Sequence, residues 1–190
     1  GKMKEIALHI MDIAQNSIRA GASGIRITLS ESVAADYLTL TVSDNGGGMD
    51  EVTRSKAADP WFTSRTTRKV GMGLPLLEMN ASLSGGAMTI DSAQGKGTTV
   101  TATFVHSHVD RPPLGDISGT IALLIMSNPA INIEYIHISE GTKWSISTAE
   151  IKEALGEDAV TDLTVVRSVR EIINENVAEV RNFQSGYDKY

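Results

Sequence analysis

The chain has 190 residues, 41% of them hydrophobic, and carries a formal net charge of −6 at pH 7 with no cysteine. This composition predicts a globular protein with a packed core, and it excludes disulfides, thiolate metal sites and cysteine nucleophiles. Residues 1–108 hold 10 basic and 10 acidic side chains, so the net negative charge lies beyond them. Neither part shows the basic face of a nucleic-acid binder. The apolar run at 121–126 is far shorter than the roughly 20 residues of a membrane helix, and no secretory signal is visible. We therefore expect a cytoplasmic protein that binds neither nucleic acid nor membrane.

Apolar positions at helical spacing predict a helix over residues 3–20. Polar residues recur along the same helix at steps of three and four, which is also the pattern of an ordinary solvated face. Further on, the pattern predicts strands over 25–29 and 37–42, a helix over 74–83, and strands over 88–91 and 98–105. Residues 50–70 show no sustained period, so we expect a long loop there, of the kind that often acts as a lid.

A stretch rich in Pro and Gly at 109–119 predicts a linker. It divides the chain into a first domain over 1–108 and a small C-terminal region over 120–190. In and beyond the linker we expect a short apolar helix near 117–127, a hairpin of strands 131–138 and 142–147, a helix from Ser147 to about Leu155, and a final helix over 163–182. The sequence does not indicate a role for this C-terminal region.

Asp12 and Asn16 are four residues apart on the first predicted helix, so their side chains lie one above the other. The amide oxygen of Asn16 is a hard ligand suited to Mg²⁺, which commonly takes one or two protein oxygens together with phosphate and water. Asp12 can hold an attacking water as a general base, or can complete the metal shell. Arg19 continues the stripe and can reach a phosphate, although an isolated surface arginine is the commoner interpretation.

Asp44 ends a predicted strand and is followed by Asn45 and three glycines. A carboxylate in this position can accept a hydrogen bond from the amino group of adenine, while the glycine backbone approaches the ring closely. An Asp-Asn-Gly turn without a ligand is the structural alternative. The other motifs of the series favour the adenine site.

Residues Gly71, Met72 and Gly73 precede Leu74, where a helix is expected to begin. Exposed amide groups at a helix start favour phosphate oxygens. The Lys-Ser or Lys-Thr step of a Walker loop is missing, as is the third glycine of a dinucleotide-binding turn. Later, Gly95-Lys-Gly97 permits close packing and places Thr98 where its hydroxyl can approach the adenine edge, although an ordinary hairpin turn fits the same letters.

Taken in order, these motifs resemble the GHKL superfamily, the Bergerat-fold ATP-binding domain of gyrase, the MutL repair proteins, heat-shock chaperones and histidine kinases. The resemblance covers about residues 3–106. The matching stretches are the N box from Asp12, the G1 box from Asp44 to Met49, the F box at 60–63, the G2 box at 71–74 and the G3 region at 95–99. The chain also resembles small stand-alone bacterial members of this superfamily. The implied fold is a two-layer α/β sandwich, an α+β fold whose mixed, mainly antiparallel sheet is covered by helices.

The same resemblance implies ATP and Mg²⁺ as cofactors. It makes Asn16 the magnesium ligand, Asp44 the adenine reader, and Gly46 and Gly48 points of close backbone approach within the G1 box. The resemblance also implies that residues 71–74 bind the phosphates. Hydrolysing relatives have Glu at the position of Asp12, so the shorter Asp argues against efficient hydrolysis.

No helix with a phosphoacceptor histidine precedes the domain, so we expect no autophosphorylation in cis. The leading hypothesis is a kinase-like protein that transfers the γ-phosphate of ATP to a partner protein, or that acts as an ATP-dependent switch. The alternatives are a slow ATPase coupled to homodimerisation, with Asp12 as the catalytic residue, and a non-catalytic sensor of ATP and ADP. The sequence does not distinguish these three hypotheses, because the same pocket serves all of them and the difference lies in the partner.

Overall fold

The computed structural model describes residues 4–59 and 72–185. Within them a six-stranded sheet has the order β3-β4-β2-β1-β5-β6. The strands are β1 (Gly24–Ser32), β2 (Tyr37–Asp44), β3 (Met88–Ser92), β4 (Thr98–Val105), β5 (Asn132–Ser139) and β6 (Thr142–Ser147). All neighbours are antiparallel except β1 and β5, which run parallel. The expected mixed, mainly antiparallel sheet is confirmed.

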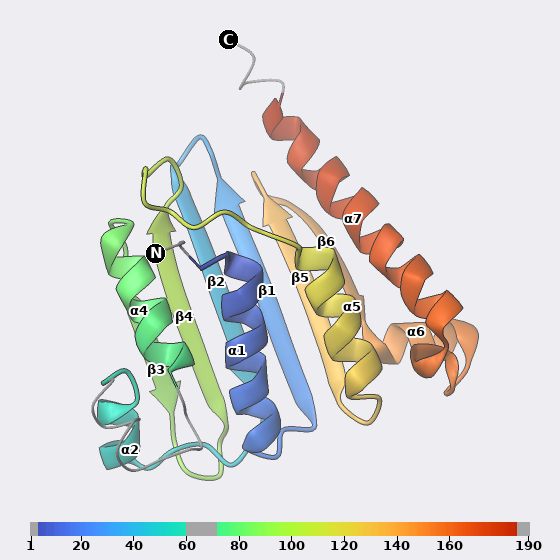
Figure 1. Cartoon of the computed structure of the whole chain (residues 1–190), viewed down its shortest axis with the longest axis horizontal. Helices are drawn as coiled ribbons and strands as arrows, with labels where there is room; N and C mark the ends of the chain where they lie inside the picture. Colours follow the sequence, from blue (N-terminus) through green and yellow to red (C-terminus); the bar gives the residue numbers. More distant parts are fainter. Residues whose placement is uncertain (1–3, 60–71, 186–190) are drawn as a thin grey trace.

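Helices cover one face of this sheet and form the second layer (Figure 1). The covering helices are α1 (Ile6–Arg19), α4 (Gly73–Leu83), α5 (Ile117–Ser127) and α7 (Leu163–Ser185). Shorter elements are α2 (Glu51–Lys56), α6 (Thr148–Leu155) and the 3₁₀ turn η1 (Ala159–Thr161). In the described part of the chain, no helix combines the length and hydropathy that a membrane crossing requires. The two-layer α+β architecture expected from the sequence is confirmed.

The core lies between the two layers and follows the periodicities of the sequence. In α1, the apolar side chains of Ile6, Ile10 and Ile13 recur at steps of three and four and are buried. In β1, every second side chain from Ile25 onward is buried, because alternate residues of a strand face the helices. The same patterns predicted these elements, and the observed ends differ from the expected ones by only a few residues.

Residues 50–59 are a correction to the expected long loop, because α2 begins at Glu51. Asp50 caps this helix, and its carboxylate accepts a 2.7 Å hydrogen bond from the backbone N–H of Thr53. The helix has only six residues and none of them is buried, so it leaves no hydrophobic period to detect. The rest of the expected loop, including the F box and Gly71, lies outside the described residues.

The stretch after residue 108 builds the other half of the sheet. β5 pairs with β1 from Gly24 opposite Asn132 to Glu31 opposite Ser139, and β6 completes the predicted hairpin. The Ser147 hydroxyl accepts a hydrogen bond from the N–H of Glu150 and caps α6 as expected. The division into 1–108, 109–119 and 120–190 stays a prediction, but strands from both sides of it belong to one sheet.

A buried carboxylate joins several elements near the end of β1. Glu31 is fully buried and accepts a 2.7 Å hydrogen bond from the Nε2 atom of His137 on β5. His106 lies 3.2 Å from the same carboxylate, and so does the Nε atom of Arg181 on α7. Burial alone raises the pKa of Glu31, but the hydrogen bond to His137 and the charge of Arg181 outweigh it and lower this pKa to about 2. Glu31 is therefore ionised and fastens α7 to the sheet.

Candidate functional site

A cavity of about 680 Å³ opens between α1, the end of β2 and the start of β4. Seven of the residues predicted from the sequence line it: Asn16, Arg19, Asp44, Gly48, Met49, Leu74 and Thr98. Side chains that are remote in sequence thus meet at one place. Asp12, Gly46, Met72 and Gly73 are not among its lining residues, and Gly71 lies outside the described part of the chain.

Asp44 is held in a fixed orientation by two hydrogen bonds. One carboxylate oxygen accepts a 2.6 Å bond from the hydroxyl of Ser17, and the other accepts a 2.8 Å bond from the backbone N–H of Gly46. Ser17 is buried on α1, so it fixes the distance between this helix and the end of β2. A carboxylate that already has two donors retains lone pairs for a third, such as an exocyclic amino group.

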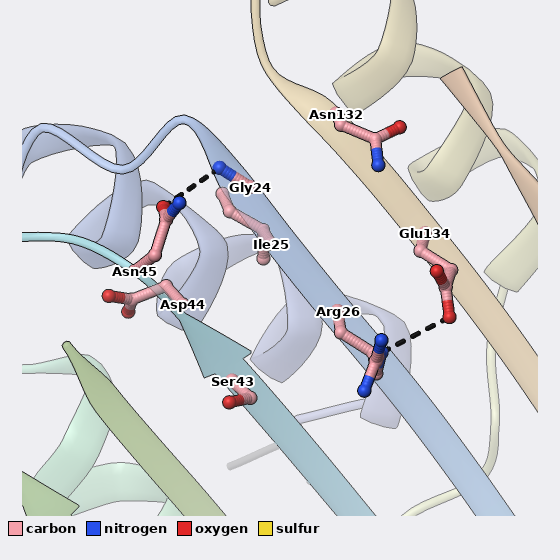
Figure 2. Close-up of a pocket in the computed structure, with 8 residues that line it drawn as sticks. All are labelled: Gly24, Ile25, Arg26, Ser43, Asp44, Asn45, Asn132 and Glu134. Atoms are coloured by element: carbon pink, nitrogen blue, oxygen red, sulfur yellow. Dashed lines mark hydrogen bonds and ion pairs between the residues drawn. The ribbon is translucent and has the colours of Figure 1, made fainter. Parts of the chain in front are cut away.

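Asn45 anchors the end of β2 from the other side (Figure 2). Its carboxamide oxygen accepts 2.9 Å hydrogen bonds from the backbone N–H groups of Ser23 and Gly24, at the start of β1. Figure 2 shows a second, smaller cavity of about 260 Å³ on this side, whose lining includes Asp44 and Asn45 as well as the ion pair of Arg26 and Glu134. The Asp44 carboxylate is turned away from that ion pair. Asn45 therefore fixes the backbone at the end of β2, directly after Asp44.

Glycine is required at two points beside the cavity, at Gly48 in its lining and at Gly97 next to it. Gly48 has a φ of +70°, and a side chain there would clash with the carbonyl oxygen of Ala93. Gly97 has a φ of +82°, and a side chain there would clash with the carbonyl oxygen of Asp44. This close packing brings the segment after β2 against the turn before β4. Gly46 is likewise tight against Ala20, so it packs behind the cavity and does not line it.

A hydroxyl pair closes the wall between these two segments. The backbone N–H of Met49 donates a 2.8 Å hydrogen bond to the hydroxyl of Ser92, which lies 2.8 Å from the hydroxyl of Thr98. Thr98 is directly opposite Asp44 in the β2–β4 ladder. This register places Thr98 next to Asp44, and the approach of its hydroxyl to the adenine edge stays a prediction.

Asn16 has the free polar capacity of a ligand-binding residue. Its amide nitrogen is buried without a hydrogen-bond partner among the described residues, while its oxygen accepts a 3.3 Å bond from Arg19. This nitrogen is a hydrogen-bond donor, so it suits an acceptor of a ligand, such as a phosphate oxygen, whereas only the amide oxygen can hold a metal. The described residues contain no cluster of three or more His, Asp or Glu suited to a metal. One amide oxygen holds Mg²⁺ only together with phosphate oxygens and water, so the donor set fits a metal that arrives with a nucleotide.

Asp12 lies one turn from Asn16 on α1 and is engaged in an ion pair. The ammonium group of Lys4 donates a hydrogen bond to its carboxylate. Gly73, at the start of α4, approaches the same residue, because a side-chain carbon built there would be 3.1 Å from the Cβ atom of Asp12. The start of α4 therefore lies beside the carboxylate that the sequence assigned to catalysis.

His9 lies beside this pair and is uncharged. Burial is the largest effect that lowers its pKa, and the charge of Lys4 adds to it against the opposing charge of Asp12, so that the pKa falls from 6.5 to about 4. The ring is fully buried, and its Nε2 atom lies 2.7 Å from the amide nitrogen of Asn80 on α4. His9 thus joins α1 to α4 as a packed, neutral side chain.

Three positioning residues were not identified from the sequence: Ser17, Asn45 and Ser92. For Ser17 a signal existed, since it is a polar residue on the buried face of an amphipathic helix, where a hydroxyl needs a partner. Ser92 gives no comparable signal, because its partners come from the segment after β2 and from the following turn.

Comparison with known proteins agrees with this geometry. Residues 2–108 match the model of the family described as histidine kinase-, DNA gyrase B-, and HSP90-like ATPase. Sensor protein kinase FleS of Pseudomonas aeruginosa is 35% identical over 108 residues, which are 57% of this chain and 26% of that protein. Heme sensor protein HssS of Staphylococcus saprophyticus is 29% identical over 96 residues, 49% of this chain and 20% of that one. The chain thus spans about a quarter or less of the length of these relatives.

One solved structure supports the fold. The crystal structure of the N-terminal domain of a DNA repair protein superposes with a TM-score of 0.52 at 17% identity, and the match covers 81% of this chain and 57% of that one. The matched part of the chain is longer than the stretch 2–108 that fits the family model, so the structural similarity also includes residues after 108.

Proposed function

Because the chain belongs to the histidine kinase-, DNA gyrase B-, and HSP90-like ATPase family, we propose that it binds Mg-ATP in the cavity of Asn16 and Asp44 and transfers the γ-phosphate to a partner protein. The observation that carries this proposal is the convergence of an oriented carboxylate and an unpartnered buried amide on one cavity. The phosphoacceptor is expected on another protein, and that partner is not identified by the sequence.

In this proposal each wall of the cavity has one task. Asp44 accepts a hydrogen bond from the amino group of adenine, while the backbone at Gly48 lies against the ring. Asn16 supplies the one protein oxygen for Mg²⁺, which neutralises charge on the phosphates when bound. Leu74 lines the cavity at the start of an 11-residue helix, where backbone N–H groups such as those of Gly73 and Leu74 favour phosphate oxygens. Arg19 lies close enough to Asn16 to add a positive charge there.

Calorimetric titration with ATP and Mg²⁺ tests the binding step. The unaltered protein should bind ATP, and Asp44→Asn should weaken binding, because its amide places a donor where adenine also presents one. Asp91→Asn is the matched control, since Asp91 is an exposed carboxylate on β3 outside the cavity. Equal binding by the two variants would contradict the assignment of Asp44.

Incubation with ATP labelled at the γ-phosphate, together with a lysate of the source organism, tests the transfer step. We expect label on a second protein in the presence of the unaltered chain and none with Asp44→Asn. Steady release of labelled phosphate without a labelled protein would favour the slow ATPase. Binding without any chemistry would favour a nucleotide sensor.

A further inference from the structure

Lys4 occupies the carboxylate on which hydrolysis at this site would depend. Its ammonium group donates a hydrogen bond to Asp12, and both side chains are partly withdrawn from solvent, with exposed fractions of 27% and 37%. We infer that Lys4 is a positioning residue that prevents Asp12 from acting as a general base on water, so that bound ATP keeps its γ-phosphate for a protein acceptor. This inference rests on the proposed function of the Asn16 and Asp44 cavity.

The backbone that follows Lys4 is fixed by a distant segment of the chain. The N–H groups of Ile6 and Ala7, at the start of α1, donate 2.9 Å hydrogen bonds to the carbonyl groups of Pro113 and Leu114. A helix start normally leaves such donors free, so these two bonds tie the entry of α1 to the segment before α5. The backbone next to Lys4 is therefore held in place. As a result, Lys4 loses less conformational entropy on pairing with Asp12 than a lysine in a free tail would lose.

Asp12 is confined from the other side by α4. Gly73 lies against it, and the neighbouring ring of His9 is neutral, with its Nε2 atom bonded to Asn80. Arg19 bonds to Asn16 at the opposite end of α1, about two turns of helix beyond Asp12. Among the described residues, Lys4 is therefore the cation that bonds to Asp12.

The chemical consequence concerns one proton. A general base must face the attacking water, and the bond to Lys4 holds the Asp12 carboxylate outside the lining of the cavity. When Lys4 is removed, the carboxylate can turn toward the cavity and accept a proton from water. The water oxygen then forms a bond to the γ-phosphorus, the bond from this phosphorus to the bridging oxygen breaks, and its electron pair leaves with ADP.

The test compares Lys4→Met, Lys4→Arg, the double variant Lys4→Met with Asp12→Asn, and the unaltered protein. General-base catalysis typically contributes about 10²–10⁴-fold, so we expect Lys4→Met to raise phosphate release at least about tenfold. Lys4→Arg should keep the low rate, because it retains the ion pair, and the double variant should also be slow. Lys152→Met is the matched control, since Lys152 pairs with Glu157 on the remote α6 side of the molecule.

Two measurements do not depend on turnover. Calorimetry should give Lys4→Met the same affinities for ATP and ADP as the unaltered protein, because Lys4 acts through Asp12. Acetylation of Lys4 by a soluble reagent, followed by mass spectrometry, should be faster in Asp12→Asn than in the unaltered protein. A selective loss of ATP affinity in Lys4→Met would mean that Lys4 contacts the γ-phosphate, and this result would overturn the inference.

Unchanged phosphate release in Lys4→Met, or unchanged acetylation in Asp12→Asn, would also overturn it. Failure of the unaltered protein to bind ATP is a different outcome, because it removes the proposed function itself. The two failures are therefore distinguishable in a single set of titrations.

Discussion

The hydroxyl of Ser17 donates a 2.6 Å hydrogen bond to the carboxylate of Asp44 and thereby joins the middle of α1 to the end of β2. Asn16, the neighbour of Ser17 in sequence, lines the same cavity as Asp44. One turn of helix thus carries both a proposed metal ligand and the support of a proposed adenine reader. A substitution at Ser17 should therefore change the orientation of the Asp44 carboxylate more than it changes the stability of the fold.

Ser17→Ala removes this support and leaves the Asp44 carboxylate free to rotate. The loss of one such hydrogen bond typically costs about 1 kcal/mol, so we expect ATP affinity to fall about fivefold. Titration calorimetry with ATP measures it. Ser168→Ala, on the exposed side of α7, is the control and should bind as the unaltered protein does. Unchanged affinity in Ser17→Ala would show that Gly46 alone orients the carboxylate.

Gly48→Ala tests the close packing of the cavity wall. Its new side chain clashes with the carbonyl oxygen of Ala93, whereas Gly141→Ala has a similarly unfavourable φ of +81° with open space around it. We expect Gly48→Ala to lower the free energy of unfolding by about 1–3 kcal/mol more than Gly141→Ala does, because overpacking adds to backbone strain. Urea unfolding of the two variants measures the difference. Equal losses of unfolding free energy in the two variants would mean that the backbone near Ala93 accommodates the added methyl group without a further loss of stability.

Glu31→Gln tests the buried carboxylate that fastens α7. Removing one partner of a buried charged network typically costs about 3–5 kcal/mol, because the other charges remain buried, and we expect a loss of that size at pH 7. Glu134→Gln is the control, since its partner Arg26 is exposed and surface pairs contribute about 0–1 kcal/mol. Urea unfolding measures both.

Acid should remove the same contribution in the unaltered protein. The pKa of Glu31 is lowered from 4.5 to about 2, so its contribution to stability is present above pH 4.5 and is lost as the pH falls toward 2. In Glu31→Gln the free energy of unfolding should change less between these pH values. An equally steep acid dependence in the variant would contradict the assignment.

His9 gives a second pH dependence, in a higher window. The pKa of His9 is lowered from 6.5 to about 4. Between pH 6.5 and pH 4 the unfolded chain therefore binds a proton at His9 that the folded protein does not bind. The free energy of unfolding should therefore decrease as the pH falls from 6.5 to 4, by at most about 3 kcal/mol at roughly 1.4 kcal/mol for each pKa unit. His9→Gln should flatten this window, whereas His108→Gln, at a half-exposed ring, should not. Guanidinium unfolding at pH 7 and pH 5 measures the slope.

Sequence periodicity was sufficient for the elements that have a buried face. α1 and β1 show clear periods of 3.6 and 2, and both were predicted within a few residues. α2 was missed because a helix of six residues without a buried side chain has no such period. Its one signal was the capping side chain of Asp50, and a single cap is too common in turns to indicate a helix.

For the cavity, the sequence identified the residues that carry the proposed chemistry better than the residues that hold them. Asn16 and Asp44 were predicted to share a site, and they line one cavity. The partnership of Asp12 with Lys4 was not predicted, although the two are eight residues apart, because the chain before α1 takes its course from Pro113 and Leu114. Contacts of this kind depend on tertiary pairing that no local pattern encodes.

The parallel pairing of β5 with β1 has a consequence for how this chain can be divided. A fragment that stops at residue 108 keeps all the family motifs but leaves the whole length of β1 as an unprotected edge, with its backbone amides and carbonyls open to any extended peptide. It also removes α5 from the side of α1, which exposes apolar surface that the full chain keeps buried. Such a fragment should self-associate when expressed, so the smallest soluble nucleotide-binding piece of this protein is expected to extend through β5 at least.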